Sequence, residues 1–374
     1  MKNILFSLIC LITLNTQAQD FQKWISTGNI EKLTAWYEKG GNFETYMGIE
    51  YYIQSHGESA WIYFEMHPMV YAVAKNQHAI AEFYLSHENE MIEAGVWDDA
   101  VSQAFIVSIS TNNDDLTTKL YALKPDLEAT CEPCRNASAV FVAAVYANEK
   151  WFFELADKSL WDIRNDEGCN LLLAAIDGGS LPIVQFLIDQ EFELDGEDNY
   201  GRNALDYAIL DSNMQTFQYL YALKAPVSDQ IWYSLATGGN FEIYSSLKDS
   251  LDKTSLQFSN EYNVWPLHYA VNFNYTEIVL DMVRIMKEEI AASDYMYFDG
   301  TIIDFAQYHI LYLTMLNENK ITYEAVLDLC HFVNLGNEDP EYIRFDKIYR
   351  KKAIKVFGKD FVEDMDRKYE VSWY

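Results

Sequence analysis

The amino-acid sequence predicts an all-α solenoid made of repeated helix-turn-helix units. Gly168 and Gly201 lie 33 residues apart, and so do Ala175 and Ala208. Each glycine is followed by an apolar pair, a small alanine, a short polar break and a second apolar segment. In residues 183–187 the apolar side chains recur at i, i+3 and i+4, which places them on one helix face. No unit can bury such a face alone, so the units must stack.

The best copies of this pattern carry a specific motif. Residues 265–270 read W-P-L-H-Y-A, and Ile278 and Val279 follow in the second apolar segment. The motif resembles the ankyrin repeat, whose family pattern is G-x-T-P-L-H-x-A-A-x-x-G-H-x-x-I-V-x-x-L-L. Asn263 stands where the family has glycine. The resemblance implies an ankyrin-repeat solenoid, and an unrelated α-helical solenoid or bundle is the alternative.

About nine degenerate units can be placed between residues 20 and 335. The residues at their alanine positions are Trp24, Ala72, Ser108, Ala144, Ala175, Ala208, Leu235, Ala270 and Ala306. Most of the spacings are close to the ankyrin period of about 33 residues. Two stretches exceed the repeat, the tyrosine-rich residues 44–66 and residues 308–322. We expect these insertions to be loops or extended helices that belong to the binding surface.

The chain divides into three predicted segments. Residues 1–18 read as a signal peptide, with Lys2 ahead of an apolar run at residues 4–14 and cleavage after Ala18. A buried N-terminal helix is the alternative. Residues 19–339 form the repeat array, which is strongest at 166–231 and 261–285. Residues 340–374 are expected to form helices that cap it, and Pro340 suits a helix start.

The charge of the chain restricts its partners. The sequence has 27 Lys and Arg against 57 Asp and Glu, and loss of residues 1–18 leaves 26 against 57, a net charge of −31. Such a chain repels nucleic acid and anionic lipid, and favours a protein partner with a basic surface. The basic residues concentrate between Arg344 and Lys355. They indicate a solvated helix face, and a docking patch is the alternative.

Cys131 and Cys134 form the motif C-E-P-C between two units. Such a pair can be a disulfide, half of a zinc site or a redox couple. No second C-x-x-C or H-x₃₋₅-H completes a zinc site, and no βαβ pattern supports a thioredoxin-like centre. In an exported chain we expect a local disulfide. Cys169 and Cys330 are predicted to be small buried residues.

Other catalytic signals do not stand out. His268 has no acid–base or metal partner at a suitable spacing. The resemblance implies that it hydrogen-bonds the backbone and ties repeats together, and Asp206 and Asp304 occupy the same frame position. The sequence lacks G-x-S-x-G, H-E-x-x-H, phosphate-loop and dinucleotide motifs. The acidic residues 195–199 lack the spacing of a calcium loop. We therefore predict no enzyme, no metal and no cofactor.

The resemblance implies a partner-binding concave side made of hairpin tips and first-helix positions. Mapped here, it predicts one stripe comprising Asp166, Glu167, Asp177, Asn199, Tyr200, Arg202, Asp211, Glu261, Tyr262, Val264, Asn272 and Phe273. We expect an exported, periplasmic or secreted monomer that binds another protein and inhibits or regulates a secreted or envelope protein. An enzyme using Cys131 and Cys134 and a purely structural scaffold are the alternatives.

Overall fold

The computed structural model describes residues 16–55, 58–111, 113–156, 161, 163–257, 264–292, 310–335, 344–345, 347–369 and 371–373. Most of these residues are helical, and the chain forms two compact units. Unit 1 comprises residues 1–204 and 223–226, and unit 2 comprises residues 205–222 and 227–374. None of the described helices combines the length and the apolar character that spanning a bilayer takes.

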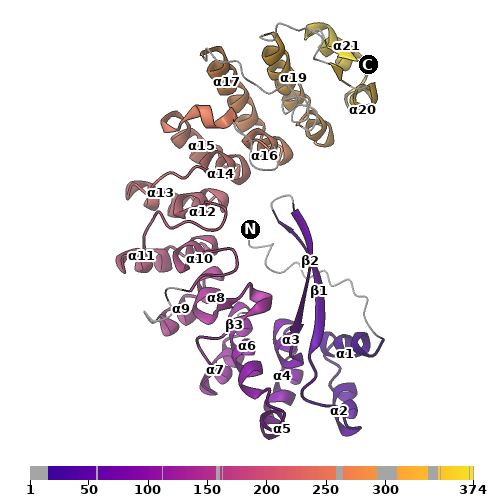
Figure 1. Cartoon of the computed structure of the whole chain (residues 1–374), viewed down its shortest axis with the longest axis vertical. Coiled ribbons are helices and arrows are strands. Elements are labelled where there is room, and N and C mark those ends of the chain that lie inside the picture. Colours follow the sequence, from indigo (N-terminus) through magenta and orange to yellow (C-terminus); the bar gives the residue numbers. More distant parts are fainter. Residues whose placement is uncertain are drawn as a thin grey trace. The chain divides into compact units, whose positions relative to one another are not determined.

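Unit 1 contains antiparallel helix pairs and two β-hairpins, one long and one short (Figure 1). The helices are α1 (Thr16–Ser26), α2 (Ile30–Glu38), α3 (Pro68–Ala74), α4 (His78–Leu85), α5 (Glu88–Glu93), α6 (Trp97–Ser110), α7 (Asp114–Ala122), α8 (Ala139–Val145), α9 (Glu149–Leu155), α10 (Leu171–Gly178) and α11 (Leu181–Asp189). Strands β1 (Met47–Ser55) and β2 (Glu58–Met66) pair with each other, as do β3 (Thr130–Cys131) and β4 (Ala137–Ser138) around η1 (Glu132–Cys134). The first helices α3, α6, α8 and α10 pack in sequence.

Unit 2 continues the same design. Its helices are α12 (Ala204–Leu210), α13 (Met214–Ala222), α14 (Ile231–Gly238), α15 (Phe241–Leu247), α16 (Pro266–Asn272), α17 (Thr276–Ala292), a helical segment at 310–316, α19 (Lys320–Leu335), α20 (Lys347–Phe357) and α21 (Lys359–Lys368), with 3₁₀ turns η3 (Lys248–Ser250) and η4 (Lys253–Gln257). Strands β5 (Arg344–Phe345) and β6 (Ser372–Trp373) pair in parallel. Helix α14 packs on α16, and α17 packs on α19.

We call the short turn that joins the two helices of a pair the turn edge. It comprises residues 27–29, 75–77, 146–148, 178–180, 211–213, 238–240, 273–275 and 317–319. In every one of these turns the middle residue has a left-handed backbone: Gly28, Asn76, Ala147, Gly179, Ser212, Gly239, Asn274 and Glu318. In several, the next N–H reaches back five residues to a carbonyl, as from Gln77 to Ala72 at 2.8 Å and from Asn213 to Ala208 at 3.1 Å. This is a common way to end a helix.

The same bond corrects two of the predicted alanine positions. Asn148 N–H donates to Ala143 rather than Ala144, and Asn319 N–H donates to Thr314. Thr314 thus occupies the alanine position of the last unit, and the predicted Ala306 lies outside the described residues. Small residues fill these positions because neighbouring helices approach closely there, and Ala143, Ala175 and Thr314 are fully buried. The helix pairs confirm the predicted repeat fold, and the number of units stays a prediction.

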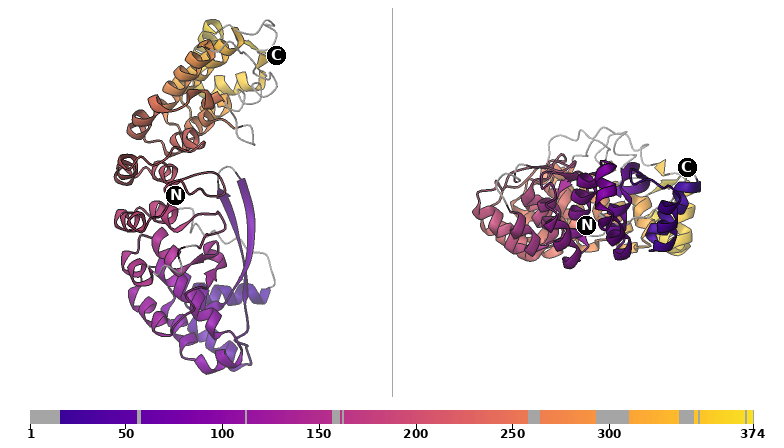
Figure 2. Two further views of the ribbon diagram at one scale, coloured as in Figure 1. Left: turned by 60° about the vertical axis from the view of Figure 1, so that its left-hand side comes forward. Right: turned by 90° about the horizontal axis from the view of Figure 1, so that it is seen from below.

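The tyrosine-rich insertion is neither a loop nor an extended helix. Strands β1 and β2 pair antiparallel from Met47↔Met66 to Ser55↔Glu58, and Figures 1 and 2 show one long ribbon that continues beyond α1 and α3. The sequence prediction was wrong here, because the alternation of apolar and polar residues in 49–54 favours a strand. The base of the ribbon is fixed by Tyr46, whose hydroxyl donates to Asp99 at 3.0 Å.

His67 joins the ribbon to the first turn of α3. Its Nδ1 accepts from Met69 N–H at 3.2 Å, and its Nε2 lies 3.2 Å from the carbonyl oxygen of Phe43. These two contacts require the neutral ring with the proton on Nε2. Burial lowers the pKa of His67 to about 4, since a charged imidazolium would be desolvated there.

Helices lie at the C-terminus as predicted. The Tyr323 ring of α19 packs 4.9 Å from the Phe357 ring at the end of α20, and Arg350 of α20 pairs with Asp366 of α21 at 2.8 Å. Val362 and Met365 are buried between the helices. That these helices act as a cap, with a boundary at residue 340, stays a prediction, because residues 336–343 lie outside the described part of the chain.

Candidate partner-binding site

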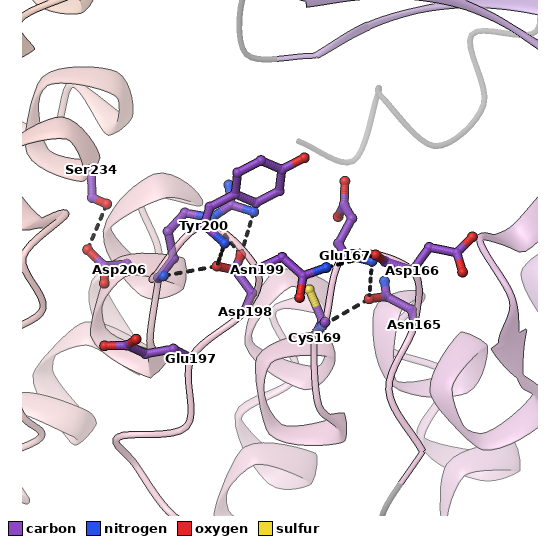
Figure 3. A network of polar contacts seen from close by, with 12 residues as sticks. Asn165, Asp166, Glu167, Cys169, Glu197, Asp198, Asn199, Tyr200, Asp206 and Ser234 are labelled. Atoms are coloured by element: carbon purple, nitrogen blue, oxygen red, sulfur yellow. Dashed lines mark hydrogen bonds and ion pairs between the residues drawn. The ribbon is translucent and has the colours of Figure 1, made fainter. Parts of the chain in front are cut away.

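Three turns of unit 1 form a row at the N-terminal ends of the first helices. We call residues 131–137, 165–169 and 198–202 the tip row. Two of its turns are built alike, around a side-chain oxygen at the first position (Figure 3). Asn165 Oδ1 accepts from the N–H of Glu167 and of Cys169, and Asp198 Oδ1 accepts from the N–H of Tyr200 and of Arg202. Such side-chain bonds replace the missing backbone partners of a tight turn.

Each turn of the row is hydrogen-bonded to the next. Asp166 N–H donates to the Arg135 carbonyl at 3.1 Å, and Asn199 N–H donates to the Glu167 carbonyl at 2.9 Å. Asn199 Nδ2 also donates to the Asp166 carbonyl at 3.0 Å. Gly168 allows this close approach, since it has φ of +76° and a Cβ there would lie 2.4 Å from Asn199 Oδ1. The row is therefore a connected backbone ladder rather than three separate loops.

Side chains strengthen the contact between the first two turns. The Arg135 guanidinium forms an ion pair with the Glu167 carboxylate. Asn136 Nδ2 donates to both carboxylate oxygens of Asp166, at 2.8 and 3.0 Å. Sequence reasoning missed Arg135 and Asn136, although they follow C-E-P-C directly. Both have left-handed φ, 57° and 55°, which few residues other than glycine adopt.

The row presents acidic and aromatic side chains. In Figure 3, the Glu167 and Tyr200 side chains extend to the same side of the loops, and the Asp166 side chain points along the row. Asp166 and Asn199 are exposed, Glu167 is half-buried, and Tyr200 is 52% exposed. Four predicted residues are thus brought together on a surface with negative charge and one large ring. This combination suits a partner with basic and apolar groups.

The place of Arg202 needs correction. Its side chain is buried, and its guanidinium pairs with Asp198 at 2.6 Å, with only 8% and 0% of the two side chains exposed. The guanidinium also lies 4.8 Å from the centre of the Tyr200 ring. Arg202 therefore supports Tyr200 from beneath and does not offer its charge to a partner. The i, i+4 spacing from Asp198 was the signal that could have shown this.

The remaining predicted residues do not join the tip row. Asp177 is half-buried near the C-terminal end of α10, eight residues long, so about 12 Å of helix separates it from the tips. Asp211, Asn272 and Phe273 belong to turns or helix ends in unit 2, and Phe273 is 46% exposed. Val264 is half-buried, and its carbonyl accepts from the Tyr233 hydroxyl at 2.9 Å. Glu261 and Tyr262 lie outside the described residues.

His268 and Asp206 make structural bonds. His268 is buried, and its Nδ1 accepts from Trp265 N–H at 3.0 Å, which fixes the start of α16. The Asp206 carboxylate is buried and accepts from the Ser234 hydroxyl at 2.7 Å, joining α12 to α14. His268 therefore holds the backbone of its own repeat, and Asp206 ties one repeat to the next through a side chain. Asp304 lies outside the described residues.

The four cysteines that the structure describes are buried. The Sγ atoms of Cys131 and Cys134 lie 2.9 Å apart as two thiols, so the disulfide stays a prediction. Cys169 and Cys330 are buried, as predicted. Within the residues that the structure describes, no three His, Cys, Asp or Glu side chains are placed to hold a metal ion.

The Arg344–Lys355 basic run falls largely on α20. Lys351 is exposed, and Lys352 Nζ lies 3.8 Å from the centre of the Tyr312 ring. Arg350 is committed to Asp366. These contacts are those of a solvated face with internal partners.

Known proteins resemble this chain over part of its length. A family model for three copies of the ankyrin repeat matches residues 140–231, which include the last two turns of the tip row. An ankyrin repeat protein of Acanthamoeba polyphaga mimivirus is 26% identical over 188 residues. The match covers 50% of this chain and 28% of the viral protein, so most of that relative has no counterpart here.

Proposed function

This chain is an ankyrin-repeat protein, and from that premise we propose that it is an exported, periplasmic module that binds another protein through the tip row. The observation that carries the proposal is the hydrogen-bonded ladder of tips. It holds Asp166, Asn199 and Tyr200 exposed on a fixed backbone. A surface that is ordered before binding loses little conformational entropy on association.

The chemistry of the row defines the partner. Asp166 supplies negative charge, since its carboxylate is held by the neutral Asn136 amide, whereas Glu167 is ion-paired with Arg135. The net charge of −30 adds a long-range field of the same sign. Tyr200 supplies the kind of large amphipathic ring that often dominates interface energy. The partner we propose is a secreted or envelope protein that presents lysine or arginine beside an apolar pocket. By covering that surface, this chain inhibits or regulates it, and it does so as a monomer.

The buried thiols argue against the redox-enzyme alternative. A catalytic cysteine needs an accessible thiolate with a lowered pKa. Here the hydrogen bond to Cys131, together with burial, raises the pKa of the Cys134 thiol well above its usual range.

The proposal of export rests on the leader-like residues 1–18, of which residues 1–15 lie outside the described part of the chain. Cleavage after Ala18 would remove the first three residues of α1 and leave Phe21 and Ile25 in the core. N-terminal sequencing of the protein from a periplasmic extract should begin at Gln19. Recovery of the uncleaved chain from the cytoplasm alone would reject export.

Binding is tested by a photo-crosslinking amino acid at position 200, followed by mass spectrometry of the captured protein and calorimetry with the purified pair. Asp166→Lys and Tyr200→Ala should each weaken affinity at least about tenfold, the loss expected at an interface hot spot. The matched controls are Asp364→Lys and Tyr221→Ala, which change an exposed acid and an exposed tyrosine elsewhere. Equal affinities for tip and control variants would reject the tip row as the binding site.

A further inference from the structure

The first turn of the tip row contains a second kind of chemistry. Strand β3 ends at Cys131, which pairs with Ala137 of β4, and η1 closes the loop between them. Asn136 N–H donates to the Cys131 carbonyl at 3.0 Å, and Arg135 N–H donates to the Glu132 carbonyl at 2.9 Å. These bonds bring the two ends of C-E-P-C together. Cys134 Sγ then lies 2.9 Å from Cys131 Sγ as a hydrogen-bond donor.

The two thiols are isolated from solvent but not from each other. Cys131 is fully buried and Cys134 is 5% exposed. A disulfide joins sulfur atoms about 2.05 Å apart, so the two sulfur atoms at 2.9 Å must move about 0.9 Å closer. The backbone hydrogen bond from Asn136 to Cys131 already holds both cysteines in one tight turn, which favours this approach.

We propose that Cys131 and Cys134 are a modification site, oxidised to a disulfide that locks the first turn of the tip row onto the second. The oxidant is a disulfide of low molecular weight, such as oxidised glutathione, or a protein disulfide. One cysteine thiolate attacks the oxidant and releases one thiolate, giving a mixed disulfide. The thiolate of the other cysteine then attacks the mixed disulfide and releases the second thiolate of the oxidant. Two protons pass from the cysteines to the two leaving thiolates. The protein thus gains one S–S bond, and the S–S bond of the oxidant is reduced to two thiols.

Burial sets when this reaction happens. The attacking species is the thiolate, and the bond between the thiols together with burial raises the pKa of Cys134. Oxidation of the closed tip is therefore slow, and oxidation of the open or folding chain is fast. Once formed, the disulfide is shielded from reductants by the same burial. This behaviour distinguishes a structural lock from a turnover catalyst.

The consequence reaches the next turn through Arg135 and Asn136. These residues follow Cys134 directly and hold Glu167 and Asp166, respectively. Both need left-handed backbone, which costs about 1 kcal/mol for such residues. A cross-link that restricts the turn stabilises this strained backbone and so orders the second turn. The inference does not depend on partner binding, because it concerns the tip row of the chain alone.

The direct test is oxidative refolding of the full chain. Denatured, reduced protein is refolded with and without oxidised glutathione, alkylated in denaturant, and mapped by peptide mass spectrometry. We expect a 131–134 linkage in the oxidised sample, with Cys330 alkylated as the buried-thiol control. The native reduced protein should form the linkage at least about tenfold more slowly than the refolding chain, because its two thiols are buried. Alkylated thiols or glutathione adducts at 131 and 134 after oxidative refolding would overturn the proposal.

The coupling is tested by hydrogen exchange on the oxidised and reduced wild-type protein, so no variant has to fold. The Asp166 amide, which donates to Arg135, should exchange at least about fivefold more slowly after oxidation. The Gln77 amide, which donates to Ala72 at a distant turn edge, is the control and should not change. Equal exchange of the Asp166 amide in the two forms would overturn the lock, even if the disulfide forms.

Discussion

The turn edge and the tip row lie at opposite ends of the same first helices and are built on different rules. At the turn edge one pattern recurs, a left-handed residue followed by a polar residue that caps the second helix, as with Asn29, Asn148 and Asn240. In the tip row the three turns differ, and only 165–169 and 198–202 share the side-chain oxygen that closes them. The uniform end provides repeat stacking, whereas the variable end is where individual chemistry can be placed.

The turn edge should be the more sensitive of the two to added volume. Gly178 ends α10 against the preceding repeat, and a Cβ there would lie 2.1 Å from the Ala144 carbonyl oxygen. Because backbone on both sides must move, Gly178→Ala should cost about 3 kcal/mol of unfolding free energy. Urea denaturation followed by circular dichroism measures this loss.

Gly40→Ala is the control for Gly178→Ala. Gly40 has φ of +95° with nothing within 4 Å of the added Cβ, so its loss comes from backbone strain alone, about 1 kcal/mol. If the two variants lose equal stability, the close approach at the turn edge does not limit packing.

At the tip end, the cap of α3 can be titrated. The folded pKa of His67 is about 4 and its unfolded pKa is 6.5, so the unfolded chain binds more protons between these values. Its contribution to stability is complete above pH 6.5 and is lost as the pH falls toward 4, by at most about 3 kcal/mol. His67→Asn keeps a cap but cannot titrate. The difference between the unfolding free energies of the two proteins should therefore change over this pH range, and a constant difference would contradict the assignment.

Two side chains of the turn edge allow the stability from helix capping to be compared with the stability from a hydrogen bond between repeats. Asn148 Oδ1 accepts from Trp151 N–H, and its Nδ2 donates to the Ile109 carbonyl of the preceding repeat at 3.2 Å. Gln77 makes only the second kind of bond, to the Ser26 carbonyl at 3.0 Å. Asn148→Ala should cost about 1.5 kcal/mol and Gln77→Ala about half of that, because only the first loses a cap. Thermal unfolding of both variants measures the difference, and equal losses would show that the cap adds nothing.

The contrast between the two ends also explains what the sequence could predict. The 33-residue frame was visible because Gly168, Gly201, Ala175 and Ala208 serve the same packing purpose in successive repeats. The alanine position was assigned one residue too late in α8, because Ala143 and Ala144 are adjacent and both are fully buried. The error was larger in the last unit, because residues 308–322 were assigned to an insertion although they contain the first helix and the turn that Thr314 belongs to.

The candidate site was less predictable than the fold. Exposure was assigned from a residue's place in the repeat, and this succeeded for Asp166, Asn199 and Tyr200. It failed for Arg202 because a charge four residues earlier, Asp198, buries with it. Contacts between successive tips, such as that of Arg135 with Glu167, join residues 32 apart. No local pattern specifies such pairs, since they depend on how closely two loops approach.

The smallest effect on stability, and the clearest separation of the two ends, is expected at Arg135. Its ion pair with Glu167 leaves 19% and 23% of the two side chains exposed, so removing it should cost less than about 1 kcal/mol. Arg135 also has a left-handed backbone, with φ of 57°. Arg135→Gly should therefore be more stable than Arg135→Ala, because glycine relieves the strain that alanine keeps.

Both Arg135 variants lose the same ion pair, so both should loosen the second turn. Hydrogen exchange at the Asp166 amide should accelerate in both variants, although Arg135→Gly should have the higher melting temperature. At the turn edge, Ala147→Gly relieves the same kind of strain and should leave the Asp166 amide unchanged. If Ala147→Gly accelerated that amide as much as Arg135→Gly, the two ends of the first helices would not be independent. The tip row would then be ordered by the stability of the whole repeat rather than by its own contacts.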